Sequence, residues 1–154
     1  MRTEGAWRVR LAEPGDYEAV RDMARMNWLE SCPDREWSED RMRATFQDEG
    51  AIIFLAEQNG EPVGFVLTSV FEYRAFVGLF TVQEVLFVKP EKRGTRAAAL
   101  LMKKLIEWSR DVVGAKEILG GNDNDVHSEQ TARFLSRFGF QSCGYAMRLD
   151  LHGR

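Results

Sequence analysis

The chain has 154 residues and a formal net charge of −3 at pH 7, with 44% hydrophobic and 29% charged residues. This size and composition predict one globular domain over residues 1–154, without an apolar run long enough to span a membrane and without the basic surface typical of nonspecific nucleic-acid binding. Cys32 and Cys143 lack metal-ligand spacing, so we expect free thiols, no metal site and a cytoplasmic protein.

The first third of the chain predicts a strand followed by two helices. Residues 7–11 alternate between apolar and polar side chains, as a half-buried strand does. Asp16 is placed to cap a helix whose apolar face extends to Trp28. Ser38 is placed to cap a second helix, after a loop that contains Pro33.

The middle of the chain predicts a β-hairpin. Apolar runs at 51–56 and 62–67 flank Asn59-Gly60, which is the preferred residue pair for a tight type I′ turn. The aromatic segment at 71–78 follows without a clear period. It closes over a site, packs on a neighbouring chain or is an ordinary loop with buried rings, and the sequence leaves these alternatives open.

A strand, a turn and a helix then follow one another within about twenty residues. The apolar run at 85–88 predicts a buried strand that Pro90 ends, because proline lacks a backbone donor. Gly94 allows the chain to turn, and Thr95 is a candidate N-cap. The helix that follows places five apolar residues on one face, namely Ala97, Leu101, Leu105, Trp108 and Val112.

This turn predicts a binding site for an anion. The first amides of a helix lack intrahelical partners, and the helix dipole is positive there, so a phosphate can bind to backbone alone. Residues 89–104 contain six Lys or Arg residues against Glu91 alone, a balance of +5. Since the whole chain carries −3, the remainder carries −8. A basic island at a helix start indicates a polyphosphate ligand.

The last third predicts a strand at 114–119 and a helix at 128–137. Gly139 ends this helix, and residues 141–151 are then expected to form a closing strand or hairpin.

The strand–turn–helix sequence resembles the acetyl-CoA motif of the GNAT superfamily of N-acetyltransferases. In that motif a strand is followed by Val-x-Pro-x-x-Arg-Gly-x-Gly-x-Gly/Ala and a helix with paired leucines. Positions 88, 90, 93, 94, 98, 100 and 101 match, whereas Arg96 stands where the family usually has its second glycine. An arginine at this position can itself contact phosphate.

The resemblance implies a fold, a cofactor and a set of binding residues. The implied fold is α/β (α+β), with a mostly antiparallel mixed sheet of six to seven strands and helices on both faces. The two N-terminal helices are implied to line the acceptor side. Acetyl-CoA is implied as cosubstrate. Its pyrophosphate would be held by Arg93, Gly94, Thr95, Arg96, Ala97 and Ala98, and its pantetheine and acetyl group by Phe87 and Val88.

Glu84 is the candidate catalytic base, because an amine that is protonated at neutral pH must lose a proton before it attacks a thioester. The period of a strand places Glu84 on one face with Val82, Leu86 and Val88, and a carboxylate there is costly unless it is paired or lines a cleft. The alternatives are an ion pair with Arg74 or Arg96, or simple solvation. The Val88 amide is implied as the oxyanion donor.

The resemblance leaves the general acid without a candidate at its usual place. Leu135 stands at the position where family members often carry a tyrosine, so water, Tyr145 or Tyr73 would have to donate the proton. Ser128 stands where the family often places an asparagine that contacts CoA, and it can equally be the N-cap of the last helix.

The implied function is acetyl transfer from acetyl-CoA to a primary amine of a small molecule or a protein. The alternative on the same fold is a CoA-binding sensor or interaction module without turnover. A nucleotide-binding protein is disfavoured, because the chain has no Gly-x-x-x-x-Gly-Lys-Ser/Thr motif. The acceptor is not identified by the sequence, and a homodimer stays open.

Overall fold

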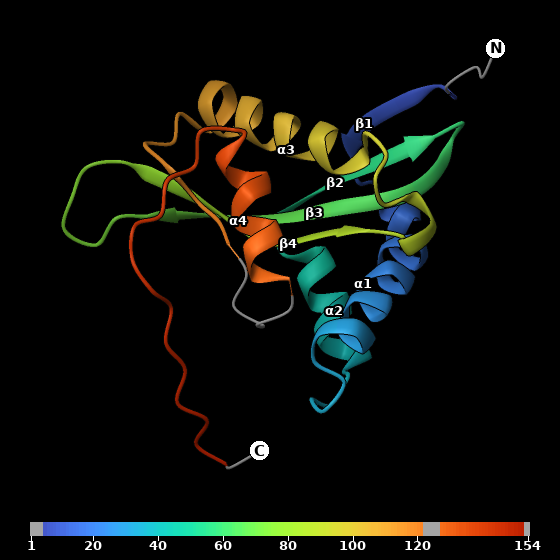
Figure 1. Ribbon diagram of the computed structural model, residues 1–154, viewed down its shortest axis with the longest axis horizontal. Helices are drawn as coiled ribbons and strands as arrows, with labels where there is room; N and C mark the ends of the chain where they lie inside the picture. Colours follow the sequence, from blue (N-terminus) through green and yellow to red (C-terminus); the bar gives the residue numbers. More distant parts are fainter. Residues whose placement is uncertain (1–4, 122–126, 153–154) are drawn as a thin grey trace. The chain divides into compact units, whose positions relative to one another are not determined.

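The computed structural model describes residues 5–121 and 127–152. They divide into two compact units, Met1–Gly120 and Gly121–Arg154. Each unit is considered by itself below (Figure 1).

The first unit is built on a five-stranded sheet with the order β1-β2-β3-β4-β5. The first four strands pair antiparallel, and the short β5 pairs parallel with β4. The strands are β1 (Trp7–Leu11), β2 (Ala51–Gln58), β3 (Glu61–Glu72), β4 (Leu79–Val88) and β5 (Ile118–Leu119).

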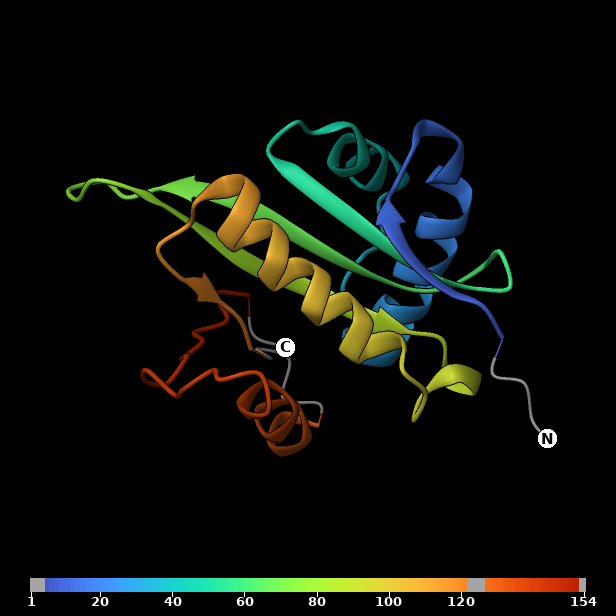
Figure 2. The same cartoon turned by 90° about the horizontal axis from the view of Figure 1, so that it is seen from above.

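Helices cover both faces of this sheet (Figures 1 and 2). A 3-10 turn η1 (Pro14–Asp16), α1 (Tyr17–Ser31) and α2 (Glu39–Gln47) lie on one face, where α1 packs against a buried cluster that includes Ile53, Leu55, Phe65 and Phe87. On the other face lies α3 (Ala97–Trp108), which follows the short turn η2 (Pro90–Lys92) and continues into a π-helical turn η3 (Ser109–Val113). A mixed sheet between two helical layers confirms the predicted α/β class.

The predicted hairpin is confirmed. Strands β2 and β3 are joined by Asn59 and Gly60, which both have positive φ, at 54° and 80°. This is the conformation that a type I′ turn requires, and asparagine and glycine adopt it at least cost.

The start of α1 differs from the prediction. Asp16 occupies the N-cap but its carboxylate makes no capping hydrogen bond. Instead it accepts hydrogen bonds from both terminal nitrogens of Arg10, at 2.7 and 2.9 Å, and from the Glu13 amide at 2.7 Å. A bidentate guanidinium is a stronger partner than an exposed amide. The second predicted cap is confirmed, because the Ser38 hydroxyl accepts from the Arg41 amide.

The packing of α3 confirms most of its predicted apolar face. Ala97, Leu101 and Leu105 are fully buried, whereas Val112 is 74% exposed, so its predicted place on that face is wrong. The π-helical turn explains the difference, because its wider turn rotates the residues after Trp108 away from the helix period. At Gly64 a Cβ atom would lie 2.7 Å from the Phe87 carbonyl oxygen and 3.4 Å from Leu101, so glycine lets α3 approach the sheet closely.

The second unit contains α4 (Ser128–Ser136), and His127 rather than Ser128 is its N-cap. Residues 141–149 form no strand, so the predicted closing strand or hairpin is wrong and the described sheet has five strands instead of six to seven. In this segment Tyr145 and Met147 are 99% and 94% exposed. A strand needs a partner, which this segment lacks among the described residues. Cys32 and Cys143 are both free thiols, as predicted.

Candidate functional site

The end of β4 leads into a tight turn that sets the start of α3. The chain leaves β4 at Val88, passes through η2 and reaches Gly94, whose φ is +82°. This left-handed conformation favours glycine, and a Cβ atom added there would meet open space. The helix begins at Ala97 with Arg96 as N-cap, one residue later than predicted, and the Thr95 hydroxyl accepts from the Ala97 amide at 3.4 Å.

Arg93 holds this turn to the rest of the unit. Its Nε donates to the Val88 carbonyl oxygen at 3.1 Å, and its Cζ lies 5.6 Å from the centre of the Phe87 ring. Its Nη2 lies 2.8 Å from both carboxylate oxygens of Glu30 on α1. The guanidinium is therefore engaged with three protein groups, which holds the turn to Phe87 and Val88 at the end of β4 and to α1.

The first turn of α3 is suited to an anion. Ala97, Ala98 and Ala99 follow the N-cap, so the first three residues of the helix carry only methyl side chains. These amides lack intrahelical acceptors, and the helix dipole adds positive potential. Together with the open space at Gly94, this arrangement leaves room for an anion at the start of α3.

Glu84 lies on β4 four residues before Val88 and is exposed. Its Oε2 accepts a hydrogen bond from the Ser69 hydroxyl on β3 at 3.0 Å. Its carboxylate is thus both hydrogen-bonded and open to solvent. Ser69 was not anticipated from the sequence, because a serine inside a strand has no distinctive pattern.

A β-bulge changes the face on which Glu84 lies. Leu67 pairs with Val85 but the next residue, Thr68, pairs with Gln83, so Glu84 is an extra residue in β4. The Thr81 hydroxyl is hydrogen-bonded to the hydroxyl of Ser109, which directly follows α3, so Thr81 faces α3. Phe87 lies an even number of residues later and would share this face in a regular strand, but it belongs to the buried cluster beside α1. The alternation must shift by one residue between them.

The consequence is a correction to the predicted face. Glu84 and its partner Ser69 lie on the side of the sheet that α1 and α2 cover, because Ser69 shares the face of Leu67 and Phe65, which pack there. Leu86 and Val88 lie on the α3 side, opposite Val66 and Gly64. The bulge therefore separates Glu84 from Leu86 and Val88, two of the three residues with which a strict period of two had grouped it.

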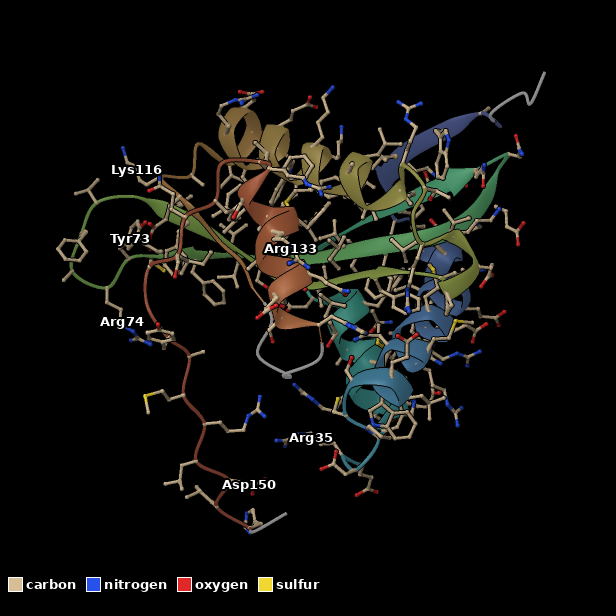
Figure 3. The ribbon with its side chains drawn as sticks, viewed as in Figure 1. Arg35, Tyr73, Arg74, Lys116, Arg133 and Asp150 are labelled. Carbon is tan, nitrogen blue, oxygen red and sulfur yellow. The ribbon has the colours of Figure 1, made fainter. Side chains whose placement is uncertain are left out.

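The candidates for a proton donor are spread over both units. Tyr73 lies in the segment between β3 and β4 (Figure 3), where its hydroxyl donates to Glu117 at 2.8 Å. Partial desolvation and this hydrogen bond raise the pKa of Tyr73, which makes it a weaker acid. Ser128, Leu135 and Tyr145 belong to the second unit. Leu135 lies on α4, where its carbonyl oxygen accepts from the amides of Phe138 and Phe140.

The described residues contain no group of three or more His, Cys, Asp or Glu side chains that could hold a metal ion. Within the same residues, no helix combines the length and the apolar composition that crossing a membrane requires.

Comparison with known proteins identifies the family of this domain. The family model described as the acetyltransferase (GNAT) family matches residues 20–140. A search of curated proteins found no matching sequence. The matched range contains Glu84 and the whole of the strand–turn–helix segment.

Solved structures share the fold at low sequence identity. A ribosomal-protein-alanine N-acetyltransferase from Brucella melitensis biovar Abortus 2308 has a TM-score of 0.76 and 14% identity, covering 94% of this chain and 100% of that one. AAC(6')-Iy in complex with the bisubstrate analogue CoA-S-monomethyl-acetylneamine has a TM-score of 0.75 and 17% identity, covering 96% and 99%. A predicted acetyltransferase with acetyl-CoA from Clostridium acetobutylicum has a TM-score of 0.74 and 15% identity, covering 95% and 97%.

Proposed function

Because this chain belongs to the acetyltransferase (GNAT) family, we propose that it is an N-acetyltransferase that uses acetyl-CoA to acetylate a primary amine. The observation that carries the proposal is the turn after β4. Gly94 in the left-handed conformation, three alanines at the start of α3 and Arg93 anchored to Val88 together support a backbone site for a diphosphate at the end of β4.

Each residue of the segment has a part in holding the cosubstrate. When bound, acetyl-CoA supplies an acyl group activated as a thioester. The residues from Gly94 to Ala98 surround the diphosphate in this proposal, with backbone amides as donors, and Thr95 and Arg96 add polar groups beside it. Phe87 and Val88 border the acyl end, where the Val88 amide donates to the acetyl oxygen. Ser128, the first residue of α4, is a further contact in this proposal.

Glu84 is the proposed base. Its carboxylate is exposed, so it can accept a proton from the attacking amine directly or through water. The Ser69 hydroxyl donates to one oxygen of this carboxylate and leaves the other oxygen, Oε1, to receive the proton. The hydrogen bond orients the group on the face covered by α1 and α2, where we place the acceptor.

The proposed acceptor is a cation that carries a primary amine. Outside residues 89–104 the chain carries −8, and opposite charge steers a cationic substrate toward the protein. The structural neighbour AAC(6')-Iy was solved with an analogue that joins CoA to an acetylneamine, which is a small amine-bearing molecule. We therefore favour a small-molecule amine and keep a protein amine as the second acceptor class.

One feature favours the alternative of a CoA-binding module without turnover. Leu135 cannot donate a proton, and Tyr73 is held by Glu117 with a raised pKa. In the catalytic proposal the departing thiolate needs no side-chain donor, because a thiol pKa near ~8.5 makes it a tolerable leaving group. We also propose a cytoplasmic location, in keeping with the free thiols of Cys32 and Cys143.

The experiment that tests the function is a thiol-release assay with acetyl-CoA and a panel of amines. The panel contains an aminoglycoside, a polyamine, a lysine-containing peptide and a peptide with a free N-terminus. Release above the rate without acceptor, together with an acetylated product of the expected mass, supports the enzyme. Tight acetyl-CoA binding without release across the panel between pH 6 and 9 supports the module instead.

A further inference from the structure

A cavity of about 440 Å³ lies between β1 and one stripe of α3, and its lining is strongly basic. Residues 96, 100, 103, 104 and 107 recur at helical spacing, so they share the side of α3 that faces Trp7, Arg8 and Val9. The charged groups that line the cavity are Arg8, Arg96, Lys103, Lys104 and Glu107.

The charge of this lining is opposite to that of the chain. Four cations stand against one carboxylate, whereas the whole chain has a net charge of −3. The structure shows no ion pair between Arg8 or Lys103 and any described residue, and Lys104 places its Nζ 5.9 Å from the centre of the Phe54 ring. Cations that line one cavity repel one another and create a positive potential inside it. A bound anion reduces this repulsion.

We propose that this cavity is a phosphate-binding site, separate from the backbone amides of the turn before α3. Arginine presents a planar fork that matches two phosphate oxygens, and the lysines add point charges from α3. Trp7 and Leu100 supply an apolar wall for the organic part of a ligand. The chemistry that fits is a phosphate ester or a polyphosphate. Its source is either a free ligand or the ribose 3′-phosphate of CoA, since Arg96 borders both the turn and the cavity.

The test measures the affinity of tripolyphosphate for the full chain by calorimetry at low ionic strength. The cavity variant is Arg8→Gln/Lys103→Gln, which removes two exposed cations outside the turn. The matched control is Arg25→Gln/Lys116→Gln, which makes the same charge change at exposed positions outside the cavity. We expect the cavity variant to bind at least about 10-fold more weakly, as loss of charge-assisted hydrogen bonds implies, and the control to bind within about 2-fold of the parent chain.

A second variant tests the proposal in the opposite direction. Glu107→Gln removes the carboxylate from the lining, so we expect several-fold tighter binding of tripolyphosphate. The proposal is overturned if the parent chain does not bind tripolyphosphate, or if the cavity and control variants lose affinity equally. Thermal unfolding of each variant confirms that it is folded.

A comparison of the affinities for acetyl-CoA and for its 3′-dephospho form shows whether the phosphate in the cavity belongs to CoA or to a separate ligand. This comparison rests on the proposed function. A preference for acetyl-CoA that disappears in the cavity variant assigns the site to the cosubstrate. Equal binding of both forms assigns it to a separate ligand. If the chain binds tripolyphosphate but not acetyl-CoA, the proposed function is refuted and the phosphate site is supported. If it binds acetyl-CoA but not tripolyphosphate, the phosphate site is refuted and the proposed function is supported.

Discussion

Arg93 fixes the turn through contacts with three protein groups. It joins the Val88 carbonyl at the end of β4, the Phe87 ring and the Glu30 carboxylate on α1. The motif identified Arg93 as a site residue, but Glu30 lies 63 positions earlier in the chain and has no sequence pattern that marks it. Only the folded chain reveals this pairing.

Replacement of Arg93 should weaken the binding of acetyl-CoA more than it lowers the free energy of unfolding. Arg93→Gln removes an ion pair between half-exposed side chains, which contributes only about 0–1 kcal/mol to the free energy of unfolding. We expect a larger effect on the Kd for acetyl-CoA, about 3- to 30-fold weaker, because the turn is no longer held to Val88. The control is Arg110→Gln, which breaks the exposed Arg110–Asp111 pair. Equal changes of Kd in both variants would contradict this positioning role.

Replacement of Glu84 should affect turnover and spare binding. Glu84→Gln keeps the size of the side chain and its hydrogen-bond acceptor but removes the base, so we expect kcat to fall about 10- to 100-fold at neutral pH. The Kd for acetyl-CoA should remain within about 2-fold of the parent value. The fall in kcat should become smaller toward pH 9, because more of the amine is already deprotonated there. The control is Glu61→Gln at an exposed position beside the hairpin turn.

Unchanged turnover of Glu84→Gln from pH 6 to 9 would remove this carboxylate from the mechanism. A parallel variant, Ser69→Ala, removes the hydroxyl that orients Glu84. It should lower kcat by less than Glu84→Gln does, because the base remains.

At the scale of elements, local patterns predict those parts of the chain that local forces determine. The Asn59-Gly60 turn and the Ser38 cap depend on neighbouring residues, and both are confirmed. The strand β1 forms as predicted, but its alternation fails at the end, where Leu11 is 53% exposed and Arg10 is half-buried between Asp16 and Glu57. The bulge at Glu84 and the π-helical turn after Trp108 depend on how whole elements fit together, so the periods of two and 3.6 misplace Glu84 and Val112.

A contact at the junction of β1 and α1 makes the free energy of unfolding depend on pH in the acidic range. The Arg10 guanidinium donates two hydrogen bonds to Asp16, and these hold the pKa of that carboxyl below its ordinary value. A lowered folded-state pKa means that the unfolded chain binds the proton more tightly. The stabilisation is therefore complete above the unfolded pKa of about 3.9 and is lost as the pH falls through the lower folded value.

The variant Asp16→Asn tests this coupling. It should lower the free energy of unfolding at pH 7 by about 1–3 kcal/mol, because Arg10 loses a charged partner, and the difference from the parent chain should narrow below about pH 4. Urea denaturation at pH 7, 5, 4 and 3 measures it, with Asp22→Asn as a control at a more exposed ion pair. A difference that is constant across this range would contradict the account.

At the scale of the whole molecule, exposed apolar side chains indicate where a second copy would pack. The segment between β3 and β4 projects beyond the sheet (Figure 2), and Phe76 and Val77 are 76% and 95% exposed beside the stacked rings of Phe71 and Phe80. Such a patch is typical of protein interfaces. We expect concentration-dependent dimers in sedimentation experiments, and we expect Phe76→Ser/Val77→Ser to be monomeric. A parent chain that stays monomeric at high concentration would exclude the homodimer.

The central claim is that the turn at Gly94 binds acetyl-CoA, and thermal unfolding with and without this compound tests it most directly. Saturation at about a hundred times the Kd should add about 2.7 kcal/mol to the free energy of unfolding, which is a readily measured rise in Tm. Gly94→Glu should abolish the rise, because it strains a left-handed position and adds negative charge where the diphosphate binds. Gly114→Glu imposes similar strain at a φ of 69°, outside this turn, and should retain it. The account is contradicted if millimolar acetyl-CoA does not raise the Tm of the parent chain. It is also contradicted if acetyl-CoA raises the Tm of Gly94→Glu as much as that of Gly114→Glu.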